Sequence, residues 1–284
     1  MSVTLAPTLD HVVINVCGEL DEASAQWQKL GFTLTERGHH SLGTSNHLSI
    51  FQENYLELLG FEPKNAHSAQ DLVNAPKGLN GLVFKTTDAE KLFSEIQAAG
   101  LRAEEPRTFH RPVQISTGVQ EARFRTVRLG AELVRNGRTF FCEHLTPELV
   151  WRDEWQTHAN GVTDLTGFIV TSVHPARTAK LYQQLFGSRL VLETTDDGVA
   201  FQAGRARVQF ITPAAAQAHF GPVETTFDGS ERNVALTFEV RSLGTLRAVL
   251  ARNHVSFVEP GNGKVVVRAA NAVGVALQFI SAPR

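Results

Sequence analysis

Three histidines and two glutamates lie close together in HHSLGTSNHLSIFQENYLELLG, residues 39–60. Imidazole and carboxylate groups hold divalent metals and transfer protons near neutral pH. The spacing of His39, His40 and His47 matches no known zinc motif, and a strand would turn Asn46 and His47 to opposite faces. We therefore interpret His40 and Asn46 as candidate substrate-contacting groups. The alternative is a solvated turn histidine and a hydrogen-bonded edge asparagine.

This stretch closes a unit that recurs along the chain. An apolar, β-branched run at 9–16 precedes a segment at 19–32 in which apolar residues fall at helical spacing, and three strand-like stretches follow. The same order returns three times, beginning at NGLVFKTT (80–87), TGFIVTSV (166–173) and VALTFEV (234–240). Four βαβββ units predict an α+β fold.

The first unit has the most distinctive motifs. LDHVV at its start, LGF, GHHSLGTSNHLSIF and YLELLG together resemble the vicinal oxygen chelate superfamily, in particular its glyoxalase-like domains. The resemblance implies four βαβββ modules paired into two glyoxalase/bleomycin-resistance/dioxygenase-like domains, each a U-shaped sheet around one cavity. We expect residues 1–150 to form the domain that carries the site, 151–165 a linker, and 166–284 a second, degenerate domain.

The resemblance also implies a metal site, because the superfamily holds its metal on the first and last strands of a module pair. The matching positions in the first domain carry His11, Glu57 and Glu143, with the apolar Leu82 at the fourth. Adjacent strand residues face opposite ways, so a register shift of one would replace Glu143 with His144. One imidazole and two carboxylates suit iron, manganese or zinc, with positions left for vicinal oxygens. Glu57 or Glu143 could also act as a catalytic base.

Other interpretations of these residues stay open. His11 could be a strand histidine that is hydrogen-bonded to its neighbour Asp10. The apolar Leu82 favours a protein that binds a small molecule without chemistry, as the bleomycin-resistance members of the superfamily do. The reaction of an enzyme would be lyase or isomerase chemistry through an enediolate, or ring cleavage with dioxygen.

The second half lacks metal-binding residues at the equivalent positions. These positions carry two amides, a phenyl ring and a methyl group, in Phe168, Gln209, Ala235 and Gln278. Extradiol dioxygenases of similar layout place two histidines and a glutamate in the C-terminal pair, so the sequence argues against that assignment. We expect no metal in this half.

Basic residues gather in the second module. Arg123 and Arg125 would share one strand face, where a guanidinium could recognise a substrate carboxylate. The alternative is a charged outer face of the sheet. The turn-rich insertion at 102–121 could lie over the cavity as a lid.

Composition limits the partners. With 27 basic and 29 acidic residues and a net charge of −2, nothing suggests a nucleic-acid partner, and we expect none. We also expect no membrane partner, because no apolar run reaches the roughly 20 residues that span a bilayer. The N-terminus lacks signal-peptide features, and the two distant cysteines form no CxxC motif, so we expect a cytoplasmic protein. A small-molecule substrate is the expected partner, and a homodimer is a candidate assembly.

Overall fold

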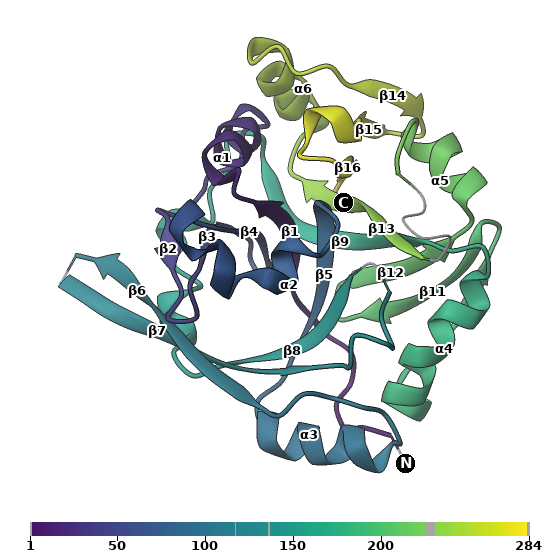
Figure 1. The fold of residues 1–284 in the computed structure, drawn as a ribbon. Coiled ribbons are helices and arrows are strands. Elements are labelled where there is room, and N and C mark those ends of the chain that lie inside the picture. Colours follow the sequence, from purple (N-terminus) through teal and green to yellow (C-terminus); the bar gives the residue numbers. More distant parts are fainter. Residues whose placement is uncertain (1, 117, 136, 225–230, 283–284) are drawn as a thin grey trace.

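The computed structural model describes residues 2–116, 118–135, 137–224 and 231–282, which form two eight-stranded mixed sheets (Figure 1). In sheet order, the first sheet contains β2 (Gly38–His39), β3 (Thr44–Ile50), β4 (Tyr55–Phe61), β1 (Leu9–Cys17), β5 (Gly78–Lys85), β8 (Arg138–His144), β7 (Gly118–Arg128) and β6 (Arg107–Ile115). The second contains β10 (Glu193–Thr195), β11 (Gly198–Ala203), β12 (Ala206–Ile211), β9 (Val162–Thr171), β13 (Arg232–Val240), β16 (Ala276–Ser281), β15 (Lys264–Val267) and β14 (Val258–Gly261).

Each sheet consists of two modules joined at its centre. The opening strands of the two modules pair antiparallel, with His11 opposite Val83 in the first sheet and Ile169 opposite Ala235 in the second. Within each module the first strand pairs parallel with the last, as β1 does with β4. The four-module, two-domain α+β architecture is therefore confirmed.

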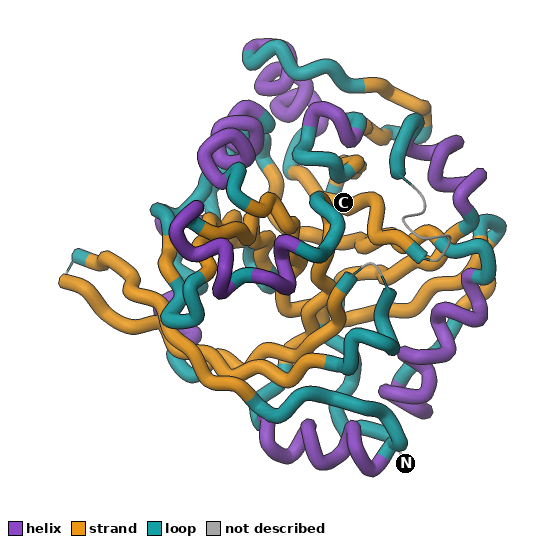
Figure 2. The backbone as a smooth tube through the Cα atoms, in the orientation of Figure 1, coloured by secondary structure: helices purple, strands orange, loops and turns teal. Residues whose placement is uncertain are grey.

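The long helices pack on one face of each sheet (Figure 2). They are α1 (Leu20–Lys29), α3 (Ala89–Ala98), α4 (Pro175–Phe186) and α6 (Leu243–Arg252). Their apolar sides join a large core that both domains share. Phe32 packs on Phe238 at 5.2 Å between ring centroids, and Phe84 packs on Phe186 at 5.1 Å. Because these contacts cross between the domains, neither domain has a core of its own on this side.

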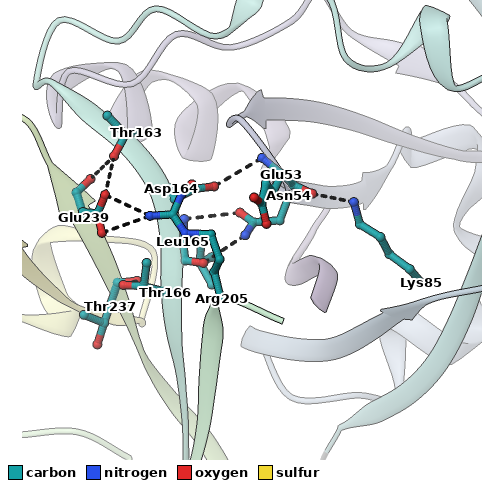
Figure 3. A network of polar contacts seen from close by, with 10 residues as sticks. All are labelled: Glu53, Asn54, Lys85, Thr163, Asp164, Leu165, Thr166, Arg205, Thr237 and Glu239. Atoms are coloured by element: carbon teal, nitrogen blue, oxygen red, sulfur yellow. Dashed lines mark hydrogen bonds and ion pairs between the residues drawn. The ribbon is translucent and has the colours of Figure 1, made fainter. Parts of the chain in front are cut away.

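A polar network also joins the domains (Figure 3). Asn54, in the turn before β4, donates a hydrogen bond to the carbonyl of Leu165 at 2.9 Å and accepts one from its N–H at 3.2 Å. The neighbouring Asp164 accepts from Arg205 at 2.7 Å, and Arg205 also reaches Glu239 at 3.3 Å. The turn that precedes Glu57 is thereby fixed against the second domain.

The predicted linker at 151–165 is more ordered than a flexible tether. Its last residues begin β9, which starts at Val162. His158 is buried and donates to the Ile50 carbonyl at 2.9 Å while accepting from the Thr33 N–H at 3.0 Å. Asn160, also buried, donates to the Leu30 carbonyl at 3.0 Å. This segment therefore packs into the first domain.

The other face of each sheet is concave and carries a short helix. In the first domain this face is crossed by η1 (Pro63–Ser68) and α2 (Gln70–Val73), and in the second by α5 (Pro213–Phe220). The first sheet nearly closes into a barrel, because the Ser41 N–H donates to the His110 carbonyl at 2.9 Å between β2 and β6. The predicted lid is thus an edge strand, β6, rather than a loop over the cavity.

The short 3-10 turns η2 (Pro147–Leu149), η3 (Asp153–Trp155), η4 (Gly187–Arg189) and η5 (Ala269–Asn271) complete the elements of the described ranges. None of the helices in these ranges has the length and apolar character to cross a membrane.

Candidate functional site

A cavity of about 330 Å³ lies on the concave face of the first sheet, beneath α2. Its volume is at the lower end of the range for small-molecule sites. The lining residues that could bind a metal, a substrate or a proton include His11, His40, Asn46, Glu57, Arg111 and Arg138. The strands β1, β3, β4, β6 and β8 supply five of them, because alternate strand residues face the same side.

His11 is held in a defined orientation at the base of the cavity. Its Nδ1 lies 2.6 Å from a carboxylate oxygen of Asp10, so Nδ1 donates the hydrogen and Nε2 keeps its lone pair. The ring stacks on Tyr55 at 4.3 Å between centroids. Nε2 lies 3.9 Å from Glu57 Oε2. His11 can therefore be both hydrogen-bonded to Asp10 and a metal ligand, because the bond to Asp10 uses Nδ1 and leaves Nε2 facing Glu57.

Asn46 links Glu57 to His40. Its amide nitrogen donates to Glu57 Oε1 at 2.6 Å and lies 3.1 Å from His40 Nε2. His40 Nδ1 lies 2.7 Å from the Thr44 hydroxyl oxygen, which accepts its hydrogen. Burial lowers the pKa of His40 to about 4, against the opposing effect of Glu57. His40 is therefore neutral at neutral pH and presents Nε2 as an acceptor.

A second group lies beside the first, around Asp10. His144 Nε2 donates to the two Asp10 oxygens at 2.9 and 3.1 Å, while His144 Nδ1 is buried without a hydrogen-bond partner in the described residues. Burial opposes ionisation of Asp10, but His144 and His11 hold its pKa well below the usual value. Burial raises the pKa of the Cys142 thiol well above its ordinary value. Ligand atoms of Asp10, Cys142 and His144 lie within 4.8 Å of one another.

Two buried arginines border the cavity with unused donors. Arg111, on β6, is only 3% exposed, and its Nε and Nη2 have no hydrogen-bond partner among the described residues. Arg138, at the start of β8, donates from Nε to Asn80 Oδ1 at 2.6 Å, and its Nη2 is unpartnered within the same ranges. Burial lowers the pKa of Arg138 to about 10, so both guanidinium groups carry a charge at neutral pH.

Four of the predicted site residues do not line the cavity: Glu143, His144, Arg123 and Arg125. Phe140 and Cys142 face inward on β8, so Glu143 points to the opposite face, where it accepts from the Ala89 N–H at 3.1 Å at the start of α3. Glu143 is therefore not available as a cavity ligand or base. His144 lies on the same side of the sheet as Cys142, as the alternative register predicted, but it contacts Asp10 and does not line the cavity.

Arg123 and Arg125 are corrected in the same way. On β7 the inward residues are Phe124 and Thr126, which turns both arginines outward. Arg123 pairs with the exposed Glu121 at 2.8 Å, and Arg125 hydrogen-bonds Thr108 at 3.2 Å. The outer-face alternative describes them correctly, and they form no part of the cavity wall.

The predictions did not include Asn15, which holds the cavity roof. Asn15 is buried on β1, and its amide nitrogen donates to the carbonyl of Leu72 at 2.9 Å and to that of Pro76 at 3.2 Å. These bonds tie α2 to the sheet above His11. Alternation along β1 could have indicated this residue, because His11, Val13 and Asn15 occupy every second position.

The donor sets can be tested against a divalent metal. His11 Nε2 and Glu57 face one cavity 3.9 Å apart, and a carboxylate orients His11 as is usual for metal-bound histidines. This pair fits a metal with its remaining positions open. In the second group, a metal would displace the hydrogen bond between His144 and Asp10. The donor chemistry therefore fits a divalent metal, and favours His11 and Glu57.

Comparisons with known proteins agree with this architecture. The family model described as "Glyoxalase-like domain" matches residues 9–186, more than half of the chain. No curated protein is significantly similar in sequence.

Among solved structures, a hypothetical protein from Staphylococcus aureus has a TM-score of 0.70 at 12% identity, covering 97% of this chain and 99% of that one. A mutant of 4-hydroxymandelate synthase from Streptomyces coelicolor has a TM-score of 0.58 at 15% identity, covering 98% and 93%. A xylose isomerase-like TIM barrel/4-hydroxyphenylpyruvate dioxygenase fusion protein also has a TM-score of 0.58, at 12% identity, covering 98% of this chain and 49% of its own. At these identities the likeness concerns the fold.

Proposed function

The chain belongs to the glyoxalase-like domain family of the vicinal oxygen chelate superfamily, and on this premise we propose that the first-domain cavity is the active site of a metal-dependent enzyme. Its substrate would be a small molecule with vicinal oxygens. The observation that carries the proposal is the spatial arrangement of Asp10, His11 and Glu57. The Asp10 carboxylate orients the His11 ring, and the other ring nitrogen faces the Glu57 carboxylate.

The cavity residues would divide the work of such a reaction. His11 and Glu57 would hold a divalent metal, which supplies Lewis-acid polarisation of a carbonyl oxygen when bound. Asp10 keeps His11 in the Nδ1–H tautomer, and Asn46 holds the Glu57 carboxylate by one oxygen. The other oxygen of Glu57 would bind the metal, and once displaced from it by the substrate it could take a proton from a carbon next to the carbonyl.

Return of that proton to the neighbouring carbon would complete an isomerisation. Departure of a leaving group from the carbon on the other side of the deprotonated carbon, with its bonding electron pair, would instead complete an elimination, which is a lyase reaction. His40, which is neutral, accepts a hydrogen bond from Asn46 at Nε2 and so helps to hold the amide that positions Glu57. Ring cleavage with dioxygen is the second reaction class, and two of the similar folds belong to proteins named for related aromatic acids.

Metal content tests the proposal directly. Protein purified without chelator or nickel affinity would be measured by elemental mass spectrometry beside His11→Ala, Glu57→Gln and the outward-facing control Glu143→Gln. We expect about one equivalent of iron, manganese or zinc in the wild type and in Glu143→Gln, and loss of the metal in the other two. Retention in both His11→Ala and Glu57→Gln would contradict the proposal. Loss confined to Cys142→Ser would instead place the metal on the group around Asp10.

A binding protein without chemistry is the second candidate function. It is favoured by the fourth position of the module pair, which remains apolar. The predicted Leu82 packs in the core on the helix side, and the residue opposite His11 on the concave side is Val83. It is also favoured by donors of Arg111 and Arg138 that have no hydrogen-bond partner among the described residues, because such donors suit capture of an anion. A protein that binds no metal after reconstitution, yet holds a small molecule at one-to-one stoichiometry without turnover, would establish this function.

A further inference from the structure

Arg111 is the most unusual side chain of the cavity wall. Its exposed fraction is 3%, yet neither Nε nor Nη2 has a hydrogen-bond partner in the described ranges. Burying a charged donor without a partner costs free energy, so such groups are rare unless something else satisfies them. The arrangement indicates a site prepared for a ligand that is itself an acceptor.

The two unused donors define the shape of that acceptor. Nε–H and Nη2–H lie on the same edge of the planar guanidinium and point in parallel, which matches the two oxygens of a carboxylate. Glu57 acts on Arg111 through its charge, but Asn46 holds Glu57 by its Oε1. Glu57 therefore leaves the edge of Arg111 open.

The wall beside Arg111 is apolar and aromatic. On the neighbouring strands β6 and β7, Phe109 and Phe124 stack at 5.3 Å between centroids, and both line the cavity with Phe140. Phe109 also contacts the edge of His40 at 5.2 Å. A ligand held at Arg111 would thus place its remaining atoms against phenyl rings, where an aromatic or branched apolar body packs well.

We propose that Arg111 binds the carboxylate of an organic acid whose apolar body packs against Phe109, Phe124 and Phe140. This inference deepens the proposed function, because it names the substrate class of the same cavity. It rests on that function only for the chemistry that follows binding. Arg138, with its free Nη2, is placed to donate to a further oxygen of the acid.

The test uses phenylacetate and its neutral isostere phenylacetamide, titrated by calorimetry into the full chain in the presence of a chelator. We expect phenylacetate to bind and phenylacetamide to bind at least about tenfold more weakly. Arg111→Met should weaken phenylacetate by about 10- to 100-fold, as expected for loss of charge-assisted hydrogen bonds. Arg111→Lys should recover only part of the affinity, because an ammonium cannot pair bidentately.

Two controls separate binding from structure and from catalysis. Arg125→Met, on the outer face of β7, should bind phenylacetate like the wild type. Arg111→Met should unfold at the same temperature as the unliganded wild type or higher, because it removes an unpaired buried charge. A purely structural arginine would give a lower temperature.

His11→Ala should lose the metal but keep phenylacetate binding, so failure of the catalytic proposal would leave this result intact. Equal affinity for the acid and the amide would overturn the inference. So would unchanged binding in Arg111→Met, or no measurable binding to the wild type at millimolar phenylacetate.

Discussion

The two domains share one topology but use their concave faces differently. In the first domain, α2 spans a cavity lined by His11, Glu57 and three arginines, of which Arg111 and Arg138 are buried. In the second, α5 follows the equivalent strand, and its Ala216 and Phe220 pack directly into the sheet. There the face is filled by Ile169, Ala235, Val266 and Ala276. A side chain of α5 thus occupies the space that the first domain leaves for a ligand.

The difference shows that the scaffold alone does not carry the function. The second domain keeps the four-strand module and contributes half of the shared core, including Phe186 and Phe238. It also fixes the turn at Asn54, from which β4 carries Glu57 into the cavity. The second domain thus supports the first domain, whose concave face keeps polar groups without partners among the described residues, at a cost in stability.

The largest change in the free energy of unfolding is expected when a charged side chain is introduced on the concave face of the second domain. Ala235 is fully buried in an apolar cluster. Ala235→Glu should lower the free energy of unfolding by about 3–5 kcal/mol, because it buries an unpaired charge. By comparison, Glu57→Gln on the polar concave face of the first domain should alter the free energy of unfolding by less than about 1 kcal/mol. Urea denaturation followed by circular dichroism measures both, and similar values for the pair would break the comparison.

A smaller difference in the free energy of unfolding is expected between a variant of α5 and a variant of α2. Phe220→Ala in α5 should cost about 3–5 kcal/mol, because it opens a void in a packed cluster. Leu72→Ala in α2 should cost about 2 kcal/mol, near the lower limit for a buried leucine, because its side chain already borders a cavity. Thermal and urea denaturation would measure the ranking. A larger loss in Leu72→Ala would contradict the assignment of α2 as a cavity roof.

A third effect depends on pH and concerns the joint between the domains. Burial lowers the pKa of His158 to about 4 in the folded protein, from 6.5. A histidine with a lowered folded pKa stabilises fully above pH 6.5, and this stability is lost as the pH falls toward 4. The loss should be at most about 3 kcal/mol, from 1.36 kcal/mol per pKa unit.

His158→Gln provides the control for that titration. Glutamine does not titrate, yet its amide can still donate to the Ile50 carbonyl and accept from the Thr33 N–H. Relative to His158→Gln, the wild type should therefore lose up to about 3 kcal/mol of unfolding free energy as the pH falls from 7 to 4. A constant difference would show that His158 titrates normally.

The smallest effect is expected on the outer face of the first sheet. Arg123→Ala and Arg125→Ala should each change stability by less than about 0.5 kcal/mol, because their ion pairs are exposed to solvent. They should also leave phenylacetate affinity unchanged. Loss of affinity in either variant would return these arginines to the binding site.

Much of this organisation follows from the sequence through strand periodicity. The repeated modules and the joint placement of His11, Glu57, Asn46 and His40 in one cavity were predictable, because the strands are short and strongly apolar. The adjacent pair Glu143 and His144 was ambiguous, because both are polar and only the register on β8 decides which one faces inward.

Strand alternation also indicates which side of the sheet each arginine faces. Arg111 alternates with Phe109 and Val113 on β6, which predicts an inward side chain. On β7 the alternation with Ala122 and Phe124 turns Arg123 outward. Arg138 alternates in the same way with Phe140 and Cys142 on β8. Its contact with Asn80, however, depends on how β5 and β8 pair. Pairing between distant strands is not readable from local sequence.

We propose that, among the described residues, the ligand binds on the concave face of the first domain, and hydrogen–deuterium exchange with and without phenylacetate tests this placement. We expect ligand protection in β4, in α2 and in β6, across residues 55–61, 70–73 and 107–115, with no change in 206–220. Protection that appears in 206–220 and not around α2 would contradict it, and would place the ligand on the second domain.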